Sequence, residues 1–260
     1  MRSKRFVKTH PPRTEKAMQI YRNKNPYYRT LFVISISRVI LMVLPIFVLV
    51  FYFWRIGSEN YLESAGFAVL ILGIVAAYAG LTRHYRILLS GHNGERALYK
   101  IIKHIRWGDD CAVFTNLPIV CGDEYSEIDM LIIGERGIII IEVKNHSGVI
   151  IGGENDDFWV QRKRFREGKS VEKKMLNPFI QLKRQRSIIK NILREQDMEV
   201  WVENLLFFSN PKVKLRIDFN KKNSRAFSSR ESLLNYINNI NPQSSLTEAQ
   251  RGKIIRRFND

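Results

Sequence analysis

Two long apolar stretches stand out in the pattern of hydrophobic and polar positions. Leu31 to Trp54 is interrupted by one charge, Arg38, and Ser64 to Leu81 carries none. As helices, these stretches would reach about 36 Å and about 27 Å, against about 30 Å for the hydrocarbon layer of a bilayer. Buried helices of soluble proteins use apolar runs of about 10 to 14 residues. The pattern therefore predicts a transmembrane hairpin with spans at about 31–54 and 64–81.

The second span carries a stripe of small residues. Gly66, Gly73 and Gly80 recur every seven residues, and two helical turns return them to nearly the same face. Such a stripe allows close approach between helices. It predicts either packing against the first span or a homo-oligomer formed through the stripe. Pro45 in the first span predicts a kink.

The flanking charges predict the orientation of the hairpin. Residues 1–30 carry nine Lys/Arg and one acid, and six basic residues follow the second span, whereas residues 55–63 carry one basic residue and two acids. Basic flanks favour the cytoplasmic side. We therefore expect a multi-pass protein of the cell membrane with both termini in the cytoplasm. Arg38 would point back toward the inner interface as a simple anchor.

After residue 83 the spacing of apolar positions becomes that of a folded α/β domain. Helical spacing occurs at 94–106, 177–196, 229–240 and 247–258. Strand-like stretches occur at 112–120, 127–133, 137–144, 149–151, 158–161 and 205–209. Asn177 is placed as an N-cap, with Pro178 at the first helical position. The main order of elements is α-β-β-β-α-β.

These patterns divide the chain into four parts. They are a basic cytoplasmic arm (1–30), the transmembrane hairpin (31–82), a linker (83–90) and the α/β domain with its C-terminal helices (91–260).

Composition and charge narrow the class of partner. The chain has 260 residues and a formal net charge of +17, which indicates a polyanionic partner, either nucleic acid or an anionic lipid bilayer. The 45% of hydrophobic residues exclude a disordered protein. Cys111 and Cys121 form no CxxC motif, which excludes a disulfide framework and a zinc ribbon. Motifs of nucleotide hydrolases, dehydrogenases and proteases are also missing from the sequence.

Candidate chemistry lies at the end of the third strand-like stretch. Alternation places Glu142 and Lys144 on one face of that strand, and Glu127 and Asp129 together on one face of the preceding strand. Both strands are continuously apolar beside these charges, so burial of the charges is costly. Carboxylates that converge with Glu95 would suit Mg²⁺ or Mn²⁺ rather than zinc. A lysine beside them would hold a water or balance charge on a phosphoryl group. An exposed ion pair at a strand end would give the same local pattern.

The helix predicted after Pro178 carries two glutamines on its apolar side. On a helical wheel with Phe179 at zero, Gln181 and Gln185 fall at about 200° and about 240°, inside the apolar arc. They are either core glutamines bonded to the backbone or amides that face the carboxylates.

Residues 162–174 hold seven Lys/Arg in thirteen positions. The stretch predicts a loop that follows phosphates, although a solvated loop or one facing lipid headgroups fits as well. The candidate nucleic-acid contacts are Arg162, Lys163, Arg164, Arg166, Lys183 and Arg184. His146, just after Lys144, is interpreted either as structural or as an aid to proton transfer.

At this point the sequence resembles the NERD (nuclease-related) domain, a branch of the PD-(D/E)xK nuclease superfamily. Four motifs in order carry the resemblance: Gly91-x-x-Gly94-Glu95, Glu127-Ile128-Asp129, Gly137 to Asn145 followed by Gly148, and Asn177-Pro178-x-x-Gln181. The resemblance implies a restriction-endonuclease-like αβββαβ core. It also implies metal ligands at Asp129 and Glu142, a catalytic lysine at Lys144, a helix carboxylate at Glu95 and an accessory glutamine at Gln181.

The leading hypothesis is therefore a membrane-anchored, metal-dependent nuclease. It would hydrolyse phosphodiester bonds on the cytoplasmic side, with DNA preferred to RNA as the partner. The alternative is a catalytically silent module that binds nucleic acid or protein at the membrane. A third possibility is an assembly anchor that oligomerises through its glycine stripe.

Overall fold

The computed structural model describes residues 7–8, 18–22, 27–55, 61–107, 111–164, 168–218, 224–241 and 245–259. Contacts divide the chain into two compact units. One unit comprises residues 1–24 and 93–260, and the other comprises residues 25–92.

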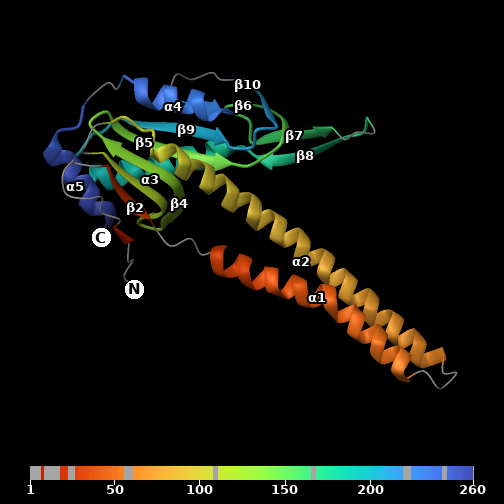
Figure 1. The fold of residues 1–260 in the computed structure, drawn as a ribbon. Coiled ribbons are helices and arrows are strands. Elements are labelled where there is room, and N and C mark those ends of the chain that lie inside the picture. The colour runs from red at the N-terminus through yellow and green to blue at the C-terminus, as the bar shows by residue number, and fades with distance from the viewer. Residues whose placement is uncertain are drawn as a thin grey trace. The chain divides into compact units, whose positions relative to one another are not determined.

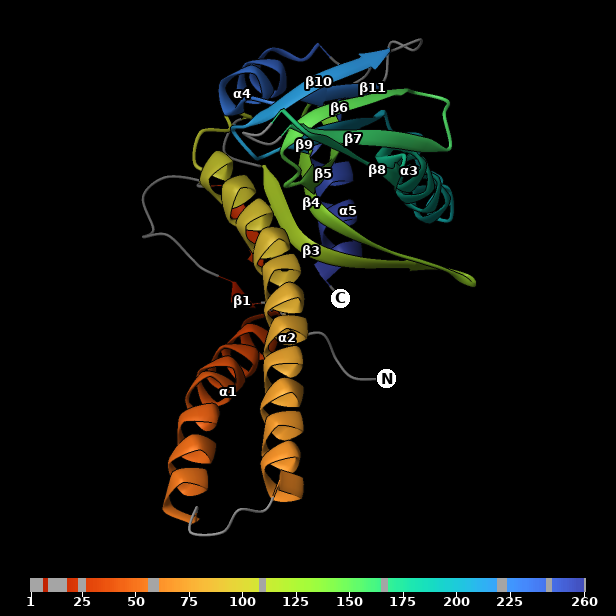
Figure 2. The ribbon, with the colours of Figure 1, turned by 90° about the vertical axis from the view of Figure 1, so that its right-hand side faces the viewer.

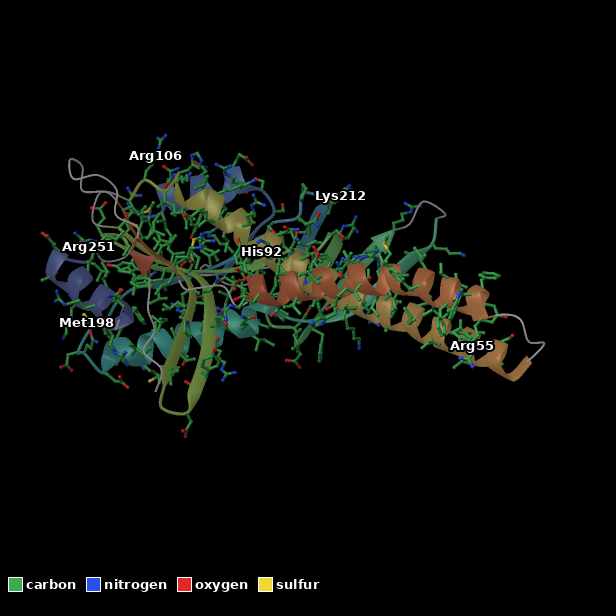
Figure 3. All side chains as sticks on the ribbon, turned by 60° about the horizontal axis from the view of Figure 1, so that its bottom comes forward. Arg55, His92, Arg106, Met198, Lys212 and Arg251 are labelled. Carbon is green, nitrogen blue, oxygen red and sulfur yellow. The ribbon has the colours of Figure 1, made fainter. Side chains whose placement is uncertain are left out.

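The unit of residues 25–92 is a pair of long helices. Helix α1 spans Tyr27–Arg55, with Pro45 inside it, and helix α2 spans Tyr61–Ile102. Both are long and apolar enough to cross a membrane, and only 6% of the apolar window of each is buried. Their side chains project outward along most of both helices (Figure 3). The structure thus has the two apolar N-terminal helices that the sequence predicts.

Aromatic and polar contacts join α1 to α2. The Phe67 ring packs against Tyr52, with centroids 5.1 Å apart, and the Tyr52 hydroxyl lies 2.9 Å from that of Ser64. Arg38 Nε donates to Thr82 Oγ1 at 3.1 Å, and its guanidinium lies 4.5 Å from the centre of the Tyr85 ring. Arg38 is therefore bound to the second helix by a hydrogen bond and a cation–π contact, and is more than the simple interfacial anchor that the sequence suggested.

The glycine stripe does not form the contact between α1 and α2. Gly66, Gly73 and Gly80 are exposed, and a Cβ added at each would meet nothing within 4 Å. Among the described residues of this unit, Ile34 and Ile74 are the buried apolar ones. Of the two uses expected for the stripe, packing against the first span is thus wrong, and pairing of two copies stays a prediction.

Helix α2 is continuous where the sequence analysis places a linker. Residues 83–90 are helical, and the helix expected over 94–106 is the last part of α2, which ends at Ile102. The uninterrupted apolar span ends at Leu81, but the helix continues through a segment of mixed polar and apolar residues to Ile102.

The larger unit contains a mixed sheet. Among the described residues, seven strands form it in the order β1-β2-β3-β4-β5-β9-β11 (Figures 1 and 2). The strands are β1 (Val7–Lys8), β2 (Gln19–Arg22), β3 (Ala112–Cys121), β4 (Glu124–Gly134), β5 (Gly137–Lys144), β9 (Val202–Phe208) and β11 (Ser224–Phe227). The three strands β3, β4 and β5 pair antiparallel, whereas β5 pairs parallel with β9. With the last part of α2 and helix α3, this is the predicted α-β-β-β-α-β order.

Helices cover both faces of this sheet, which explains why its strands are continuously apolar. Helices α3 (Pro178–Arg194) and α5 (Glu248–Asn259) pack on the face that includes Ile138 and Ile140. The end of α2 and helix α4 (Arg230–Asn239) pack on the face that includes Ile139 and Ile141. Alternation along β5 therefore aims Glu142, like Ile140, at the α3 side.

A second sheet confirms one expectation and corrects another. Among the described residues it has four strands in the order β10-β6-β7-β8, with bounds Val213–Asp218, Gly148–Gly153, Phe158–Arg164 and Ser170–Leu176. The predicted hairpin over 149–151 and 158–161 is β6 and β7. The basic stretch expected to be a loop is instead a ribbon of β7 and β8, which projects from the domain (Figure 1). The sequence shows no strand pattern here, because neither face of the outer part of the ribbon is buried and polar residues therefore do not alternate with apolar ones.

The N-terminal arm also contributes to the domain. Gln19–Arg22 form β2, which pairs parallel with β3, and the Tyr21 ring stacks on Phe114 at 4.5 Å. Residues 1–30 are therefore not wholly a separate basic arm, because Gln19–Arg22 among them belong to the sheet of the domain; much of that segment lies outside the described residues. The strand is only four residues long and pairs across about ninety positions, so its sequence carries no local signal.

Asn177 fixes the start of α3 as predicted, and it does more. Its side-chain oxygen accepts the Phe179 N–H at 2.9 Å, which is the N-cap bond. Its amide nitrogen donates to the carbonyls of Glu154 and Asp156 at 3.0 and 2.7 Å, in the turn between β6 and β7. The residue is 1% exposed. One buried side chain thus ties the second sheet to the first turn of α3.

We predict that Asn177→Ala lowers the free energy of unfolding by about 2–4 kcal/mol, from a lost cap of about 1 kcal/mol and buried carbonyls left without donors. Asn177→Asp should cost at least as much, because it keeps the cap but turns a carboxylate oxygen toward those carbonyls. Ser229→Ala is the matched control, since Ser229 caps α4 by accepting the Ser232 N–H in an exposed position. Denaturant unfolding followed by tryptophan fluorescence measures all three. Equal losses for Asn177→Ala and Ser229→Ala would contradict the account.

Candidate active site

The site lies where β4 and β5 separate. Their ladder runs from the turn to the pair Met130 and Ile141 and ends there. At the next position Asp129 Oδ2 accepts the backbone N–H of Val143 at 2.7 Å, so a side chain replaces the missing ladder bond. Strand β5 continues to pair with β9 as far as Lys144. The fork opens space beside β5 for polar side chains.

Glu142 is the centre of the site. It is 2% exposed. Its Oε1 lies 2.6 Å from Lys144 Nζ, and its Oε2 accepts hydrogen bonds from Gln181 and Gln185 at 2.8 and 3.0 Å. The ion pair of Glu142 and Lys144 therefore exists, but its carboxylate does not face water as an exposed strand-end pair would. Both carboxylate oxygens are bound.

Two glutamines from α3 complete this network. Gln181 donates its amide N–H to Glu142 and accepts from Lys144 Nζ at 3.2 Å, so it bridges the two charged groups. Gln185, fully buried, donates to Glu142 and also to the Glu127 carbonyl at 2.8 Å. Gln185 belongs to the site although only Gln181 was named as a candidate site residue; the position of Gln185 in the apolar arc was the signal. Both glutamines face the carboxylate, and Gln185 is in addition bonded to the backbone.

Glu95, on the last part of α2, meets a residue that the sequence analysis missed. Its Oε2 accepts a hydrogen bond from Asn116 Nδ2 at 3.2 Å. Asn116 lies in β3 with φ of 51°, in the left-handed region that asparagine tolerates. In the pairing of β3 with β4, Thr115 is opposite Met130 and Leu117 is opposite Ile128, and the position between them, Asn116, is not paired. An asparagine inside an otherwise apolar strand was the only signal for this break.

The carboxylates influence each other. Burial and the negative charge of Glu142 raise the pKa of Asp129 well above its usual value, the Val143 N–H and Lys144 partly offset this, and Glu95 adds to the rise. Burial and then Glu142 also raise the pKa of Glu127. Within the described residues, no three His, Cys, Asp or Glu side chains are grouped as ligands of a metal ion. The third-ligand role of Glu95 stays a prediction.

The predicted nucleic-acid contacts fall on two elements. Arg162, Lys163 and Arg164 lie on β7, and Lys183 and Arg184 lie on α3; all five are exposed. Arg162 Nε lies 2.6 Å from Glu172 Oε1, so part of its charge is compensated. Arg166 lies outside the described residues.

The pKa of His146 is affected by charged residues of the site and of the neighbouring strands. Burial and, after it, the positive charges of Lys144, Lys163 and Lys173 together lower the pKa of His146 to about 4. Its ring lies 6.5 Å from that of Phe208, the β9 partner of Lys144. The imidazole is therefore neutral near pH 7 and is surrounded by lysines.

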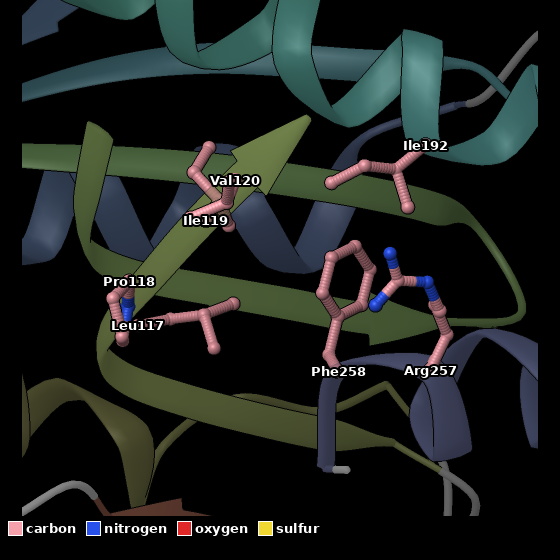
Figure 4. A pocket seen from close by; sticks show the side chains of 7 residues that line it. All are labelled: Leu117, Pro118, Ile119, Val120, Ile192, Arg257 and Phe258. Carbon is pink, nitrogen blue, oxygen red and sulfur yellow. The ribbon is translucent and has the colours of Figure 1, made fainter. Parts of the chain in front are cut away.

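A pocket of about 260 Å³ lies elsewhere on the larger unit (Figure 4). Its lining residues come from β3, α3 and α5: Leu117, Pro118, Ile119, Val120, Ile192, Arg257 and Phe258. None of them is a candidate site residue, and the predicted chemistry does not use this pocket.

Comparison with known proteins gives one match. The family model described as NERD, the nuclease-related domain, matches residues 90–209. This part of the chain is thus a nuclease-related domain, as the sequence motifs implied, and it contains Glu95, Asp129, Glu142, Lys144 and Gln181. No curated protein and no solved structure matched the chain.

We predict that His146 titrates in the folded protein near pH 4, as measured by NMR of its ring protons. Between pH 6.5 and about 4 the unfolded chain binds a proton that the folded chain does not, so this histidine makes stability fall as pH falls through that window. His146→Gln should therefore reduce the acid loss of stability. Lys163→Gln combined with Lys173→Gln should raise the pKa of His146. A midpoint near 6.5 in the unaltered protein would contradict the prediction.

Proposed function

We propose that the nuclease-related domain hydrolyses phosphodiester bonds of nucleic acid with the help of a divalent cation, and that α1 and α2 anchor it to a membrane. The observation that carries the proposal is the network in which Lys144, Gln181 and Gln185 bind the buried carboxylate of Glu142 beside Asp129. A surface ion pair would not need two inward amides from another element. The residues whose burial is unfavourable are carboxylates and a lysine, which are the groups that phosphodiester hydrolysis needs.

The donor chemistry of the site fits Mg²⁺ or Mn²⁺. Asp129 and Glu142 offer carboxylate oxygens, and each lies within the electrostatic influence of the other. Mg²⁺ is commonly held by one or two carboxylates together with substrate phosphates, and a full cage of protein ligands is not required. Asp129 and Glu142 would hold the ion, with Glu95 as a further candidate. When bound, the ion would supply an activated water and neutralise charge on the phosphoryl group.

The chain's own groups have separate tasks in this proposal. Lys144 Nζ, bonded to Glu142 and Gln181, would hold a water or a phosphoryl oxygen by hydrogen bonding and would balance negative charge. Gln181 and Gln185 orient the Glu142 carboxylate. The Val143 N–H holds the Asp129 carboxylate at the fork. The basic residues on β7 and α3 would attract the phosphate backbone.

The membrane part of the proposal rests on length, composition and exposure. Two apolar helices with 6% of their windows buried would present their side chains to lipid. The basic flanks of the helical pair favour the cytoplasm for both termini, which would place the nuclease-related domain where nucleic acid is present.

We predict Mg²⁺- or Mn²⁺-dependent cleavage of DNA by the purified full-length protein in detergent micelles, with single-stranded DNA, duplex DNA and RNA assayed in parallel. Asp129→Asn and Lys144→Met should each lower kcat by at least about 100-fold, because each removes a group that stabilises developing charge. Lys103→Met, which removes an exposed lysine at the end of α2, is the matched control and should keep full activity. Cleavage that survives both site substitutions, or that EDTA does not stop, would disprove the assignment. Binding of DNA without cleavage in the unaltered protein would favour the silent module.

We predict that the connector between α1 and α2 faces the outside of the cell. A membrane-impermeant thiol reagent should label Ser58→Cys in intact cells. The native Cys121, half-buried in the nuclease-related domain, is an internal control that should react only after permeabilisation. Labelling of Cys121 in intact cells, with Ser58→Cys protected, would reverse the orientation.

A further inference from the structure

The ribbon of β7 and β8 has two chemically different faces. The strands pair antiparallel, with Gln161 opposite Lys173 and Lys163 opposite Val171. Because side chains alternate along each strand, Lys163 and Lys173 share a face with Gln161. Arg164 and Lys174 lie on the opposite face, together with the ion pair of Arg162 and Glu172.

The face that carries Lys163 and Lys173 is the one turned toward the domain. Trp159, on that face, is fully buried and packs edge-on against Phe179, with ring centroids 5.6 Å apart. Gln161, 6% exposed, donates its amide N–H to the Ser147 carbonyl at 2.7 Å. The inner face therefore meets the chain directly after His146. Lys163 follows Gln161 on this face and Lys173 lies opposite Gln161. The Lys163 side chain runs beside Gly148, because a Cβ added there would lie 3.3 Å from Lys163 Cγ, and the charges of both lysines act on His146.

The charges on this inner face have no anionic partner in the described part of the chain. Lys163 and Lys173 form no ion pair there, whereas Arg162 on the outer face binds Glu172 at 2.6 Å. Lys144, Lys163 and Lys173 all act on the same imidazole, which stays neutral among them. Like charges on one face repel each other, and an anion bound between them would offset that repulsion.

We propose that Lys163, Lys173 and His146 form a phosphate-binding subsite that holds the nucleic-acid backbone next to Lys144. The ligand class follows from the proposed function, on which this inference rests, and from the continuity of the lysines with the candidate catalytic lysine. Lys163 and Lys173 supply charge, and neutral His146 supplies a hydrogen bond. Of the basic residues on the ribbon, the inner pair selects and positions the substrate, and the outer ones contribute only general attraction.

The test measures binding without catalysis. The full chain in detergent micelles is titrated into a fluorescent DNA oligonucleotide in EDTA at several salt concentrations. Lys163→Gln with Lys173→Gln should weaken binding about tenfold or more and lower the salt slope by nearly two, because each phosphate contact adds somewhat less than one to that slope. Arg164→Gln with Lys174→Gln is the matched control: it removes the same charge, one residue per strand, from the outer face, and should cost about threefold or less. His146→Gln should weaken binding several-fold without changing the slope.

The outcomes separate this inference from the proposed nuclease activity. Equal losses for the inner and outer pairs would overturn the subsite even if the protein cleaves DNA. A selective loss for the inner pair supports the subsite even if no cleavage is found. Loss of binding to nanodiscs of anionic lipid by the inner-pair variant, with oligonucleotide binding unchanged, would assign the lysines to lipid headgroups and overturn it. Circular dichroism of each variant shows that the fold is retained.

Discussion

The burial of the Glu142 charge is the constraint on which the rest of the domain depends. An ionised carboxylate taken out of water is stable only when it is paired and fully hydrogen-bonded. Lys144 provides the pair from the same strand, but the other two donors, Gln181 and Gln185, come from α3. The position of α3 is therefore a condition for the site. Asn177 sets that position, because it caps α3 and binds the turn between β6 and β7.

The fork between β4 and β5 is the second requirement. A regular ladder past Met130 would leave no room for polar groups between two apolar faces. Two local irregularities make that room: Asn116 adopts a left-handed conformation in β3, and Asp129 accepts the Val143 N–H in place of a ladder carbonyl. At the fork the Asp129 side chain satisfies the Val143 N–H, and at the break in β3 the Asn116 side chain binds Glu95. The polar site therefore lies where the pairing of the strands is irregular.

The sequence predicts the elements whose burial is continuous and misses those whose burial is partial. Strands β3, β4 and β5 and helix α3 have strong periodicity, so their ranges and the inward glutamines follow from pattern alone. Strand β8 does not, because its outer part is exposed on both faces and reads as a charged loop. Strand β2 is short and pairs with a strand distant in the chain. The role of Asn116 depends on a backbone break that no local pattern specifies. The apolar span ends after Leu81 but the helix continues to Ile102, so the sequence analysis placed a linker inside a helix.

Asp129 and Glu142 are unequal partners in electrostatic terms. Glu142 has an ammonium and two amide donors around it, whereas a backbone N–H holds Asp129, whose protonated form is favoured by burial and by the charge of Glu142. A cation at this position would offset repulsion that the protein's own lysine only partly cancels. Ionised Asp129 is thus destabilised in the folded domain by burial and by repulsion from Glu142. A bound cation would offset this destabilisation. Glu142, beside Asp129, has all its hydrogen bonds made. An uncompensated carboxylate next to a compensated one is expected where a ligand completes the site, and it is not expected where the residues serve stability alone.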